Sequence, residues 1–172
     1  KGDFKWAESQ LKILKASTSQ LTANDALDLK LFIGDNKNED SLQIALKHYA
    51  KADLLAFQNK KDDAIKLLNT ILEDHKTEPI VAQALLKQAQ LFEEKKQFEK
   101  AKTNYERLIK DFKEGILEDD AIFALAEMYA NTLAQPEKAK ALYESIIFEH
   151  ADSIYFVDSR KKYRALRGDA IN

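Results

Sequence analysis

Hydrophobic residues recur at helical spacing along almost the whole chain, and short polar stretches interrupt them at intervals. Apolar side chains three or four positions apart lie on one face of an α-helix, so the pattern favours helices throughout. The interruptions predict about nine helices: 4–15, 19–33, one between Asp40 and Asn59, 62–75, 82–95, 98–112, 116–131, 136–150 and 153–166. The pattern therefore predicts an all-α protein.

Individual residues mark several helix ends. Gly34 is placed to end the second helix in a left-handed conformation, and Gly168 to end the last one. Asp40 and Gln43 have the spacing of a capping box at the start of the third helix. Pro136 suits a first helical turn, where its missing N–H donor is not needed. In the last helix we expect Ile154, Val157 and Leu166 to face inward.

Composition supports this fold class and narrows the chemistry. Ala, Leu, Lys, Glu and Arg make up half of the 172 residues, whereas Gly and Pro number only 4 and 2. A hydrophobic share of 45% with 33% charged residues predicts a soluble domain and argues against disorder or a membrane span. The chain has no cysteine, which excludes disulfides, thiolate nucleophiles and cysteine-based metal sites.

The charge balance bears on partners. Lys and Arg (27) nearly equal Asp and Glu (29), which disfavours nucleic acid and anionic membranes as general partners. We therefore expect the partner to be a protein or peptide, with membrane contact unlikely. Because the chain opens at Lys1 without a Met, we expect it to be part of a longer protein. The sequence leaves the oligomeric state unknown.

A repeat appears when the chain is compared with itself. The strings at 61–65, 98–102 and 136–140 align, and their alanines (Ala64, Ala101 and Ala139) are 37 and 38 residues apart. A second alanine series, Ala52, Ala89 and Ala126, lies in the preceding helices. Periods of 20 to 50 residues are typical of stacked helical units.

These elements resemble the tetratricopeptide repeat, in which a small residue and an aromatic in the first helix precede an A-x3-F element in the second. The A-x3-F element is matched by 7–11, 64–68, 101–105 and 139–143. The small residue of the first helix is matched by Ala52, Ala89 and Ala126, and the resemblance implies that two helices approach closely there. The tryptophan place of the family pattern holds His48, Leu85 and Ile122 instead. The resemblance implies a right-handed α-α superhelix, or solenoid, of antiparallel helix pairs.

The repeat register divides the chain. We expect a single helical-repeat domain over 1–172 with these parts: 1–15 as the second helix of a truncated repeat, 16–39 as an extra helix and loop, repeats at 40–75, 76–113 and 114–151, and 152–172 as a C-terminal capping helix and tail. The extra helix and the C-terminal segment resemble the C-terminal part of large, often exported bacterial tetratricopeptide proteins. The localisation is otherwise unknown, with a bacterial envelope and the cytoplasm as the alternatives.

Catalytic and metal chemistry find no support in the sequence. The only histidines, His48, His75 and His150, have no histidine or suitable acidic pair at i+4 to form a metal-binding face. No nucleophile elbow, phosphate loop or dinucleotide fingerprint occurs. We therefore predict a protein that is not an enzyme and that has no cofactor or metal.

The resemblance also implies a binding surface. In tetratricopeptide arrays the first helix of each pair lines the concave groove, and its exposed ridge would carry Tyr49, Leu86 and Phe123, with Asp53, Gln90 and Glu127 one turn further on. Such a groove is apolar and acidic, and it lacks the lysine and asparagine that would grip a C-terminal carboxylate. Alternatively, Tyr49, Leu86 and Phe123 simply pack on neighbouring helices.

The predicted function is a non-catalytic protein-interaction module or scaffold that binds a peptide in this groove. One alternative is a structural spacer in a larger envelope protein, without a ligand. Another is contact with a membrane surface through the basic last helix, which carries Arg160, Lys161, Lys162, Arg164 and Arg167. A solvated outer face of a capping helix explains the same basic residues.

Overall fold

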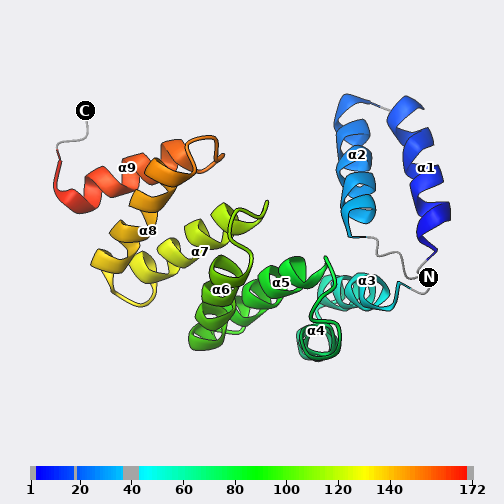
Figure 1. Cartoon of the computed structure of the whole chain (residues 1–172), viewed down its shortest axis with the longest axis horizontal. Helices are drawn as coiled ribbons and strands as arrows, with labels where there is room; N and C mark the ends of the chain where they lie inside the picture. The colour runs from blue at the N-terminus through cyan, green and yellow to red at the C-terminus, as the bar shows by residue number, and fades with distance from the viewer. Residues whose placement is uncertain (1–2, 18, 37–42, 170–172) are drawn as a thin grey trace. The chain divides into compact units, whose positions relative to one another are not determined.

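The computed structural model describes residues 3–17, 19–36 and 43–169 of the chain. Within these residues it contains nine helices and no strand (Figure 1). The helices are α1 Phe4–Ser17, α2 Gln20–Asp35, α3 Ile44–Phe57, α4 Lys61–Asp74, α5 Val81–Glu94, α6 Phe98–Asp111, α7 Glu118–Asn131, α8 Pro136–Glu149 and α9 Phe156–Arg167. The predicted all-α class is confirmed, and consecutive helices pair as in a tetratricopeptide solenoid.

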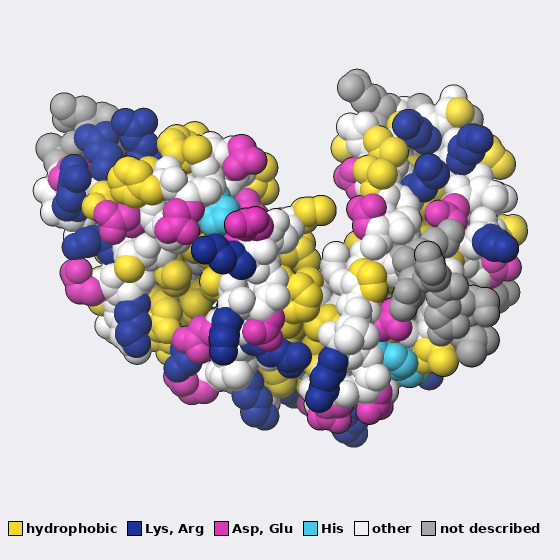
Figure 2. Space-filling model, viewed as in Figure 1, with side chains coloured by type: hydrophobic (Ala, Val, Ile, Leu, Met, Phe, Trp, Pro, Cys, Tyr) yellow, Lys and Arg dark blue, Asp and Glu magenta, His cyan; other side chains and the backbone are white. Residues whose placement is uncertain are grey.

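The chain forms two compact units, Lys1–Val81 and Ala82–Asn172. In the first unit α1 packs on α2 and α3 packs on α4. Hydrophobic side chains also remain exposed on the α1–α2 pair, among them Ile13, Leu21 and Leu31 (Figure 2). In the second unit α7 packs against α6 and α8, and α9 packs on α8.

Small side chains lie where the helices of a pair meet. The two alanine series of the repeat are completely buried, with an exposed fraction of 0% at Ala52, Ala64, Ala89, Ala101, Ala126 and Ala139. The large side chains of the A-x3-F element, Leu68, Tyr105 and Tyr143, are buried beside them. Only a small side chain lets two backbones approach this closely, so alanine at these positions fixes the spacing of the helices.

The turns between paired helices repeat as well. Asn59, Lys96 and Ala134 occupy equivalent places and have positive φ angles of 60°, 56° and 50°. At the first two turns the next residue closes the helix end: the N–H groups of Lys60 and Gln97 each donate to a carbonyl five residues earlier, at 2.8 Å. This is the geometry of a Schellman motif, which normally favours glycine or asparagine at the left-handed position.

The ends of two helices test the expectations for glycine. Gly168 has φ 86° and ends α9, as predicted. Gly34 does not end α2, because the helix continues to Asp35 and its C-cap is Asn36, which is not left-handed. The buried amide of Asn36 donates to the carbonyl of Phe32 at 2.8 Å and so satisfies that end of the helix without glycine. The predicted capping residue Asp40 lies outside the described residues.

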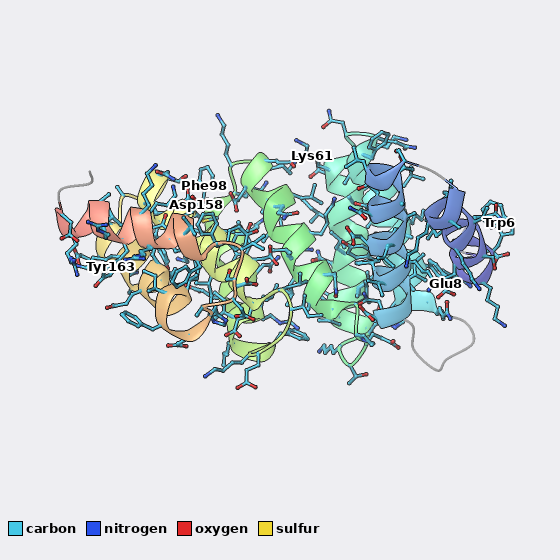
Figure 3. All side chains as sticks on the ribbon, turned by 90° about the horizontal axis from the view of Figure 1, so that it is seen from above. Trp6, Glu8, Lys61, Phe98, Asp158 and Tyr163 are labelled. Carbon is cyan, nitrogen blue, oxygen red and sulfur yellow. The ribbon has the colours of Figure 1, made fainter. Side chains whose placement is uncertain are left out.

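The last helix packs differently from the expectation. Ile154 and Val157 are 83% and 73% exposed, so the prediction that they face inward is wrong. The buried face of α9 instead carries Ser159, which is 0% exposed, and the half-buried Tyr163, whose hydroxyl donates to Glu144 of α8 at 3.1 Å. Tyr163 lies near the C-terminal end of this helix (Figure 3).

Two further expectations relate to this fold. The division into a single domain with the repeat boundaries given above stays a prediction. Over the part of the chain that the structure describes, no helix has both the length and the apolar character needed to cross a membrane.

Candidate ligand-binding groove

The six predicted groove residues lie on three helices at equivalent positions of the repeat. Tyr49 and Asp53 are on α3, Leu86 and Gln90 on α5, and Phe123 and Glu127 on α7. The first residue of each pair (Tyr49, Leu86 or Phe123) is half-buried. Of the second residues, Asp53 and Gln90 are exposed and Glu127 is half-buried. The α3 pair belongs to the first unit and the other two pairs to the second.

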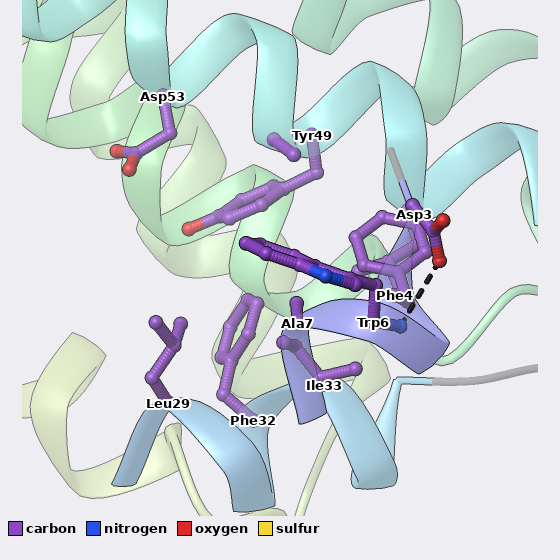
Figure 4. A pocket seen from close by; sticks show the side chains of 11 residues that line it. Asp3, Phe4, Trp6, Ala7, Leu29, Phe32, Ile33, Tyr49 and Asp53 are labelled. Carbon is purple, nitrogen blue, oxygen red and sulfur yellow. Dashed lines mark hydrogen bonds between the residues drawn. The ribbon is translucent and has the colours of Figure 1, made fainter. Parts of the chain in front are cut away.

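In the first unit the α3 pair lines a pocket of about 730 Å³. The walls are mainly apolar and aromatic, with Phe4 and Trp6 from α1, Phe32 from α2 and Tyr49 from α3. Figure 4 shows the rings of Trp6, Phe32 and Tyr49 around one space, with Asp3 and Asp53 on opposite sides. The rings of Phe32 and Tyr49 are 5.4 Å apart, and Trp6 is 64% exposed. The Trp6 side chain extends from α1 (Figure 3).

Two carboxylates make this pocket acidic. Asp53 is one helical turn beyond Tyr49, and Asp3 accepts a hydrogen bond from the backbone N–H of Trp6 at 3.0 Å. Burial raises the pKa of the Tyr49 hydroxyl, and the negative charge of Asp53 raises it further. Tyr49 therefore stays protonated and can donate a hydrogen bond. An apolar cavity with two carboxylates at its edges suits an apolar side chain together with a cation.

On α5 the predicted positions have neighbours of a different kind. Leu86 is half-buried and Gln90 is exposed, but between them Gln88 is almost fully buried, at 2% exposed. The Oε1 atom of Gln88 accepts a hydrogen bond from the Asn104 amide of α6 at 2.8 Å. This buried polar pair joins the two helices of one repeat.

On α7 the aromatic position is covered by the chain itself. The ring of Tyr155, just before α9, stacks on Phe123 with a centroid distance of 4.3 Å and an interplanar angle of 13°. The Tyr143 ring meets Phe123 edge-on at 6.1 Å. The Tyr155 hydroxyl donates to Asp120 at 2.7 Å, and burial, followed by this hydrogen bond, raises its pKa to about 12.

Glu127, one turn beyond Phe123, is the centre of a charged network. Lys162 of α9 pairs with it, with 2.8 Å between Nζ and Oε1. The carboxylate also accepts hydrogen bonds from the Tyr143 hydroxyl and, at 3.1 Å, from Asn131. Burial works to raise the Glu127 pKa, but the Lys162 and Tyr143 hydrogen bonds outweigh it, so the pKa is lowered. Glu127 is therefore ionised and neutralised by the C-terminal helix.

Tyrosine hydroxyls and carboxylates pair throughout the second unit. Each of its tyrosines donates to an acid elsewhere in the fold: Tyr105 to Glu93, Tyr129 to Glu106, Tyr143 to Glu127, Tyr155 to Asp120 and Tyr163 to Glu144. These bonds let aromatic rings pack between helices while their polar ends remain satisfied.

Metal chemistry finds no place in the described ranges. They contain no group of three or more His, Asp or Glu side chains that could hold a metal ion. His48 and His75 do approach each other, with ring centroids 5.9 Å apart at 70°. Burial, then the nearby His75 and Lys51, lower the His48 pKa, which favours its neutral form as a packing residue.

Sequence reasoning missed most of the pocket walls. Phe32 was not expected at a site, because the extra helix that carries it had no place in the repeat pattern. Trp6, on the preceding helix, was not expected there either. The available signal was Trp6 itself, because it is the only tryptophan in the sequence. The covering of Phe123 and Glu127 by Tyr155 and Lys162 spans 32 to 35 positions, which no local pattern reveals.

Comparison with known families agrees with this geometry. A stack of paired helices with alanines at the close crossings defines a helical-repeat protein. The family model described as tetratricopeptide repeat matches residues 83–114 and 120–153. These two segments are therefore tetratricopeptide repeats, a class of repeat that generally mediates protein–protein interaction and is typically non-catalytic. No curated protein matches the chain.

Proposed function

We propose that the chain is a non-catalytic protein-interaction module that binds a segment of a partner protein in the pocket lined by Tyr49 and Asp53. The preferred segment carries apolar side chains and a lysine or arginine. The observation that carries the proposal is the pocket of about 730 Å³, with aromatic walls and the carboxylates of Asp3 and Asp53. Aromatic residues in a concave site provide anchors, and the carboxylates disfavour an incoming acid.

The six groove positions contribute unequally in this proposal. Tyr49 and Asp53 provide the main contacts, because they border open space. Leu86 and Gln90 offer a partly accessible apolar and polar surface on α5. Phe123 and Glu127 serve chiefly to seat the C-terminal helix, since Tyr155 and Lys162 already contact them. That internal seating also supports the alternative of a ligand-free spacer.

Calorimetry on the 172-residue chain tests the proposal. The probes are two amidated peptide series, one with leucine, phenylalanine and lysine and one in which aspartate replaces lysine. We expect the basic series to bind more tightly and to weaken with added salt. Tyr49→Ala should reduce its affinity about fivefold or more, equivalent to about 1 kcal/mol. Asp53→Lys should shift preference toward the acidic series.

Matched controls are available on the same pair of helices. Phe57→Ala removes an aromatic side chain of α3 that is 89% exposed and outside the pocket, and Asp63→Lys reverses an exposed charge on α4. Both controls should leave affinity unchanged. Tighter binding of the acidic series, or no effect of either pocket substitution, would reject the site. Failure of every peptide to bind would favour the spacer.

A further inference from the structure

The side of α2 that faces the pocket continues beyond it as an apolar and acidic surface. Phe32 lines the pocket. Asp28, Asp25 and Leu21 precede it by four, seven and eleven residues, and these spacings return to the same side of a helix. Leu21 is 74% exposed, and both aspartates are exposed. The surface therefore presents one large apolar side chain and two carboxylates to solvent.

The same side of α1 adds a second apolar residue. Ile13 is seven residues after Trp6, which lines the pocket, and Ile13 is 59% exposed. The lysines of the two helices lie elsewhere around their axes, because none is three, four or seven residues from the residues of this side: Lys5, Lys12, Lys15 and Lys30. Ile13, Leu21, Asp25 and Asp28 thus form one surface, which we call the acidic face.

The exposed side of α9 has the opposite charge. Arg160, Lys161 and Arg164 are three, four and seven residues after Val157, so the four side chains share one side of the helix. They line a depression of about 280 Å³. Arg164 also pairs with Asp169 at 3.6 Å, whereas no residue that the structure describes forms an ion pair with Arg160 or Lys161. We call Val157, Arg160, Lys161 and Arg164 the basic face.

The basic face also carries more apolar surface than a solvated helix needs. Val157 is 73% exposed, and Ile154, just before α9, is 83% exposed. A helix that only caps an array presents a polar outer surface, so capping explains the cations but not this apolar pair. Exposed apolar side chains ringed by charges are typical of an interaction surface.

The acidic and basic faces complement each other in charge, and both have apolar side chains to bury. We propose that the basic face of one copy of this chain docks on the acidic face of a second copy, so that copies associate head to tail. An anionic membrane would satisfy only the basic face and would repel the acidic one, whereas one contact between copies covers both. Because the two faces differ, each copy can offer one face to each of two neighbours.

This proposal does not depend on the proposed function, because no residue of either face lines the pocket of Tyr49 and Asp53. Sedimentation of the 172-residue chain over a wide concentration range, at low and high salt, tests it. We expect the average mass to rise with concentration, and to rise less at high salt because the salt screens the exposed charges.

Charge reversal identifies the two faces. Asp25→Lys with Asp28→Lys should weaken association about tenfold or more, and Arg160→Glu with Lys161→Glu should do the same, because each places like charges opposite one another. A variant with all four substitutions has opposite charges again, with the signs exchanged, and should recover association. All four residues are exposed, so each variant should keep the circular dichroism spectrum of the wild type.

Controls separate this contact from other effects. Asp63→Lys and Lys66→Glu reverse exposed charges on α4 and should leave association unchanged. Tyr49→Ala, which should weaken peptide binding under the proposed function, should also leave it unchanged, so the two proposals fail separately. A mass that stays constant with concentration, or no recovery in the variant with four substitutions, would overturn the contact. Binding to phosphatidylglycerol vesicles that Arg160→Glu with Lys161→Glu abolishes, without self-association, would assign the basic face to a membrane instead.

Discussion

The hydroxyl of Tyr143, on α8, donates a hydrogen bond to the carboxylate of Glu127, on α7. The same carboxylate pairs with Lys162 of α9, so a single acid connects three helices of the second unit. Tyr143 is almost completely buried at the close crossing next to Ala139, whereas Glu127 reaches the surface. Glu127, one of the predicted groove residues, thus holds the C-terminal helix.

We predict that Tyr143→Phe destabilises the second unit by about 1 to 2 kcal/mol, because it removes a hydrogen bond to an ionised group and keeps the ring. Chemical denaturation followed by circular dichroism measures the change. Tyr163→Phe is the matched control, since Tyr163 also donates to a carboxylate, that of Glu144, but its side chain is less buried. Equal effects of the two substitutions would contradict a special role for the Glu127 network.

Ala89→Leu and Ala126→Leu should each lower stability by roughly 1 to 3 kcal/mol, because a larger side chain overpacks a helix crossing where alanine is fully buried. Thermal melts report the effect. Ala165→Leu provides the control, as Ala165 is exposed on α9. Unchanged melting temperatures for both buried variants would mean that the repeat register is wrong.

Ser159→Ala should stabilise the protein by about 1 kcal/mol. The Ser159 hydroxyl is fully buried and has no hydrogen-bond partner among the residues that the structure describes, so removing it relieves an unsatisfied polar group. The corresponding positions of the earlier repeats, Leu85 and Ile122, are apolar. Ser145→Ala controls for helix propensity, because the Ser145 hydroxyl donates to the Leu142 carbonyl. A loss of stability in Ser159→Ala would show that the hydroxyl has a partner.

Ala134→Gly should raise stability by about 0.5 to 1 kcal/mol, because Ala134 has a φ of 50°, a conformation that costs an L-residue about 1 kcal/mol. Asn59→Gly should gain less, since asparagine tolerates this conformation. Ala124→Gly, inside α7, should instead lose about 1 kcal/mol. Denaturation midpoints of the three variants give the comparison, and a loss in Ala134→Gly would contradict the left-handed turn.

The first unit should lose stability as the pH falls below about 6.5, the ordinary pKa of histidine. Burial, then His75 and Lys51, lower the folded-state pKa of His48, although Asp74 works in the opposite direction. The unfolded chain therefore binds the proton first, and stability present above pH 6.5 is lost as the pH falls toward the folded pKa.

His48→Leu should flatten this pH dependence, and leucine is the residue of the next repeat at this place. Urea unfolding between pH 7.5 and 5, followed by the fluorescence of Trp6, measures it in the first unit. An equal slope in wild type and His48→Leu would mean that another group titrates.

The sequence by itself determined the helices and their order. Apolar spacing depends on the geometry of a single helix, so it predicted the nine helices of the described residues without tertiary information, with ends mostly within a few residues. The recurrent alanines also predicted the crossings, because a small side chain has the same packing consequence in every repeat. The prediction that Gly34 ends α2 was wrong, because the Asn36 amide satisfies the carbonyl of Phe32 and glycine is not needed there.

Only the tertiary structure decided which groove positions border open space. Tyr49 and Phe123 are alike in the sequence, but one lines a pocket with Trp6 and Phe32, and the other is stacked beneath Tyr155. Likewise, the burial of Ser159 and the exposure of Ile154 follow from how α9 packs on α8. The physical reason is that a repeat pattern specifies the contacts within each repeat and between neighbouring repeats. The segments that begin and end the array have no repeated partner, so their contacts come from distant parts of the chain.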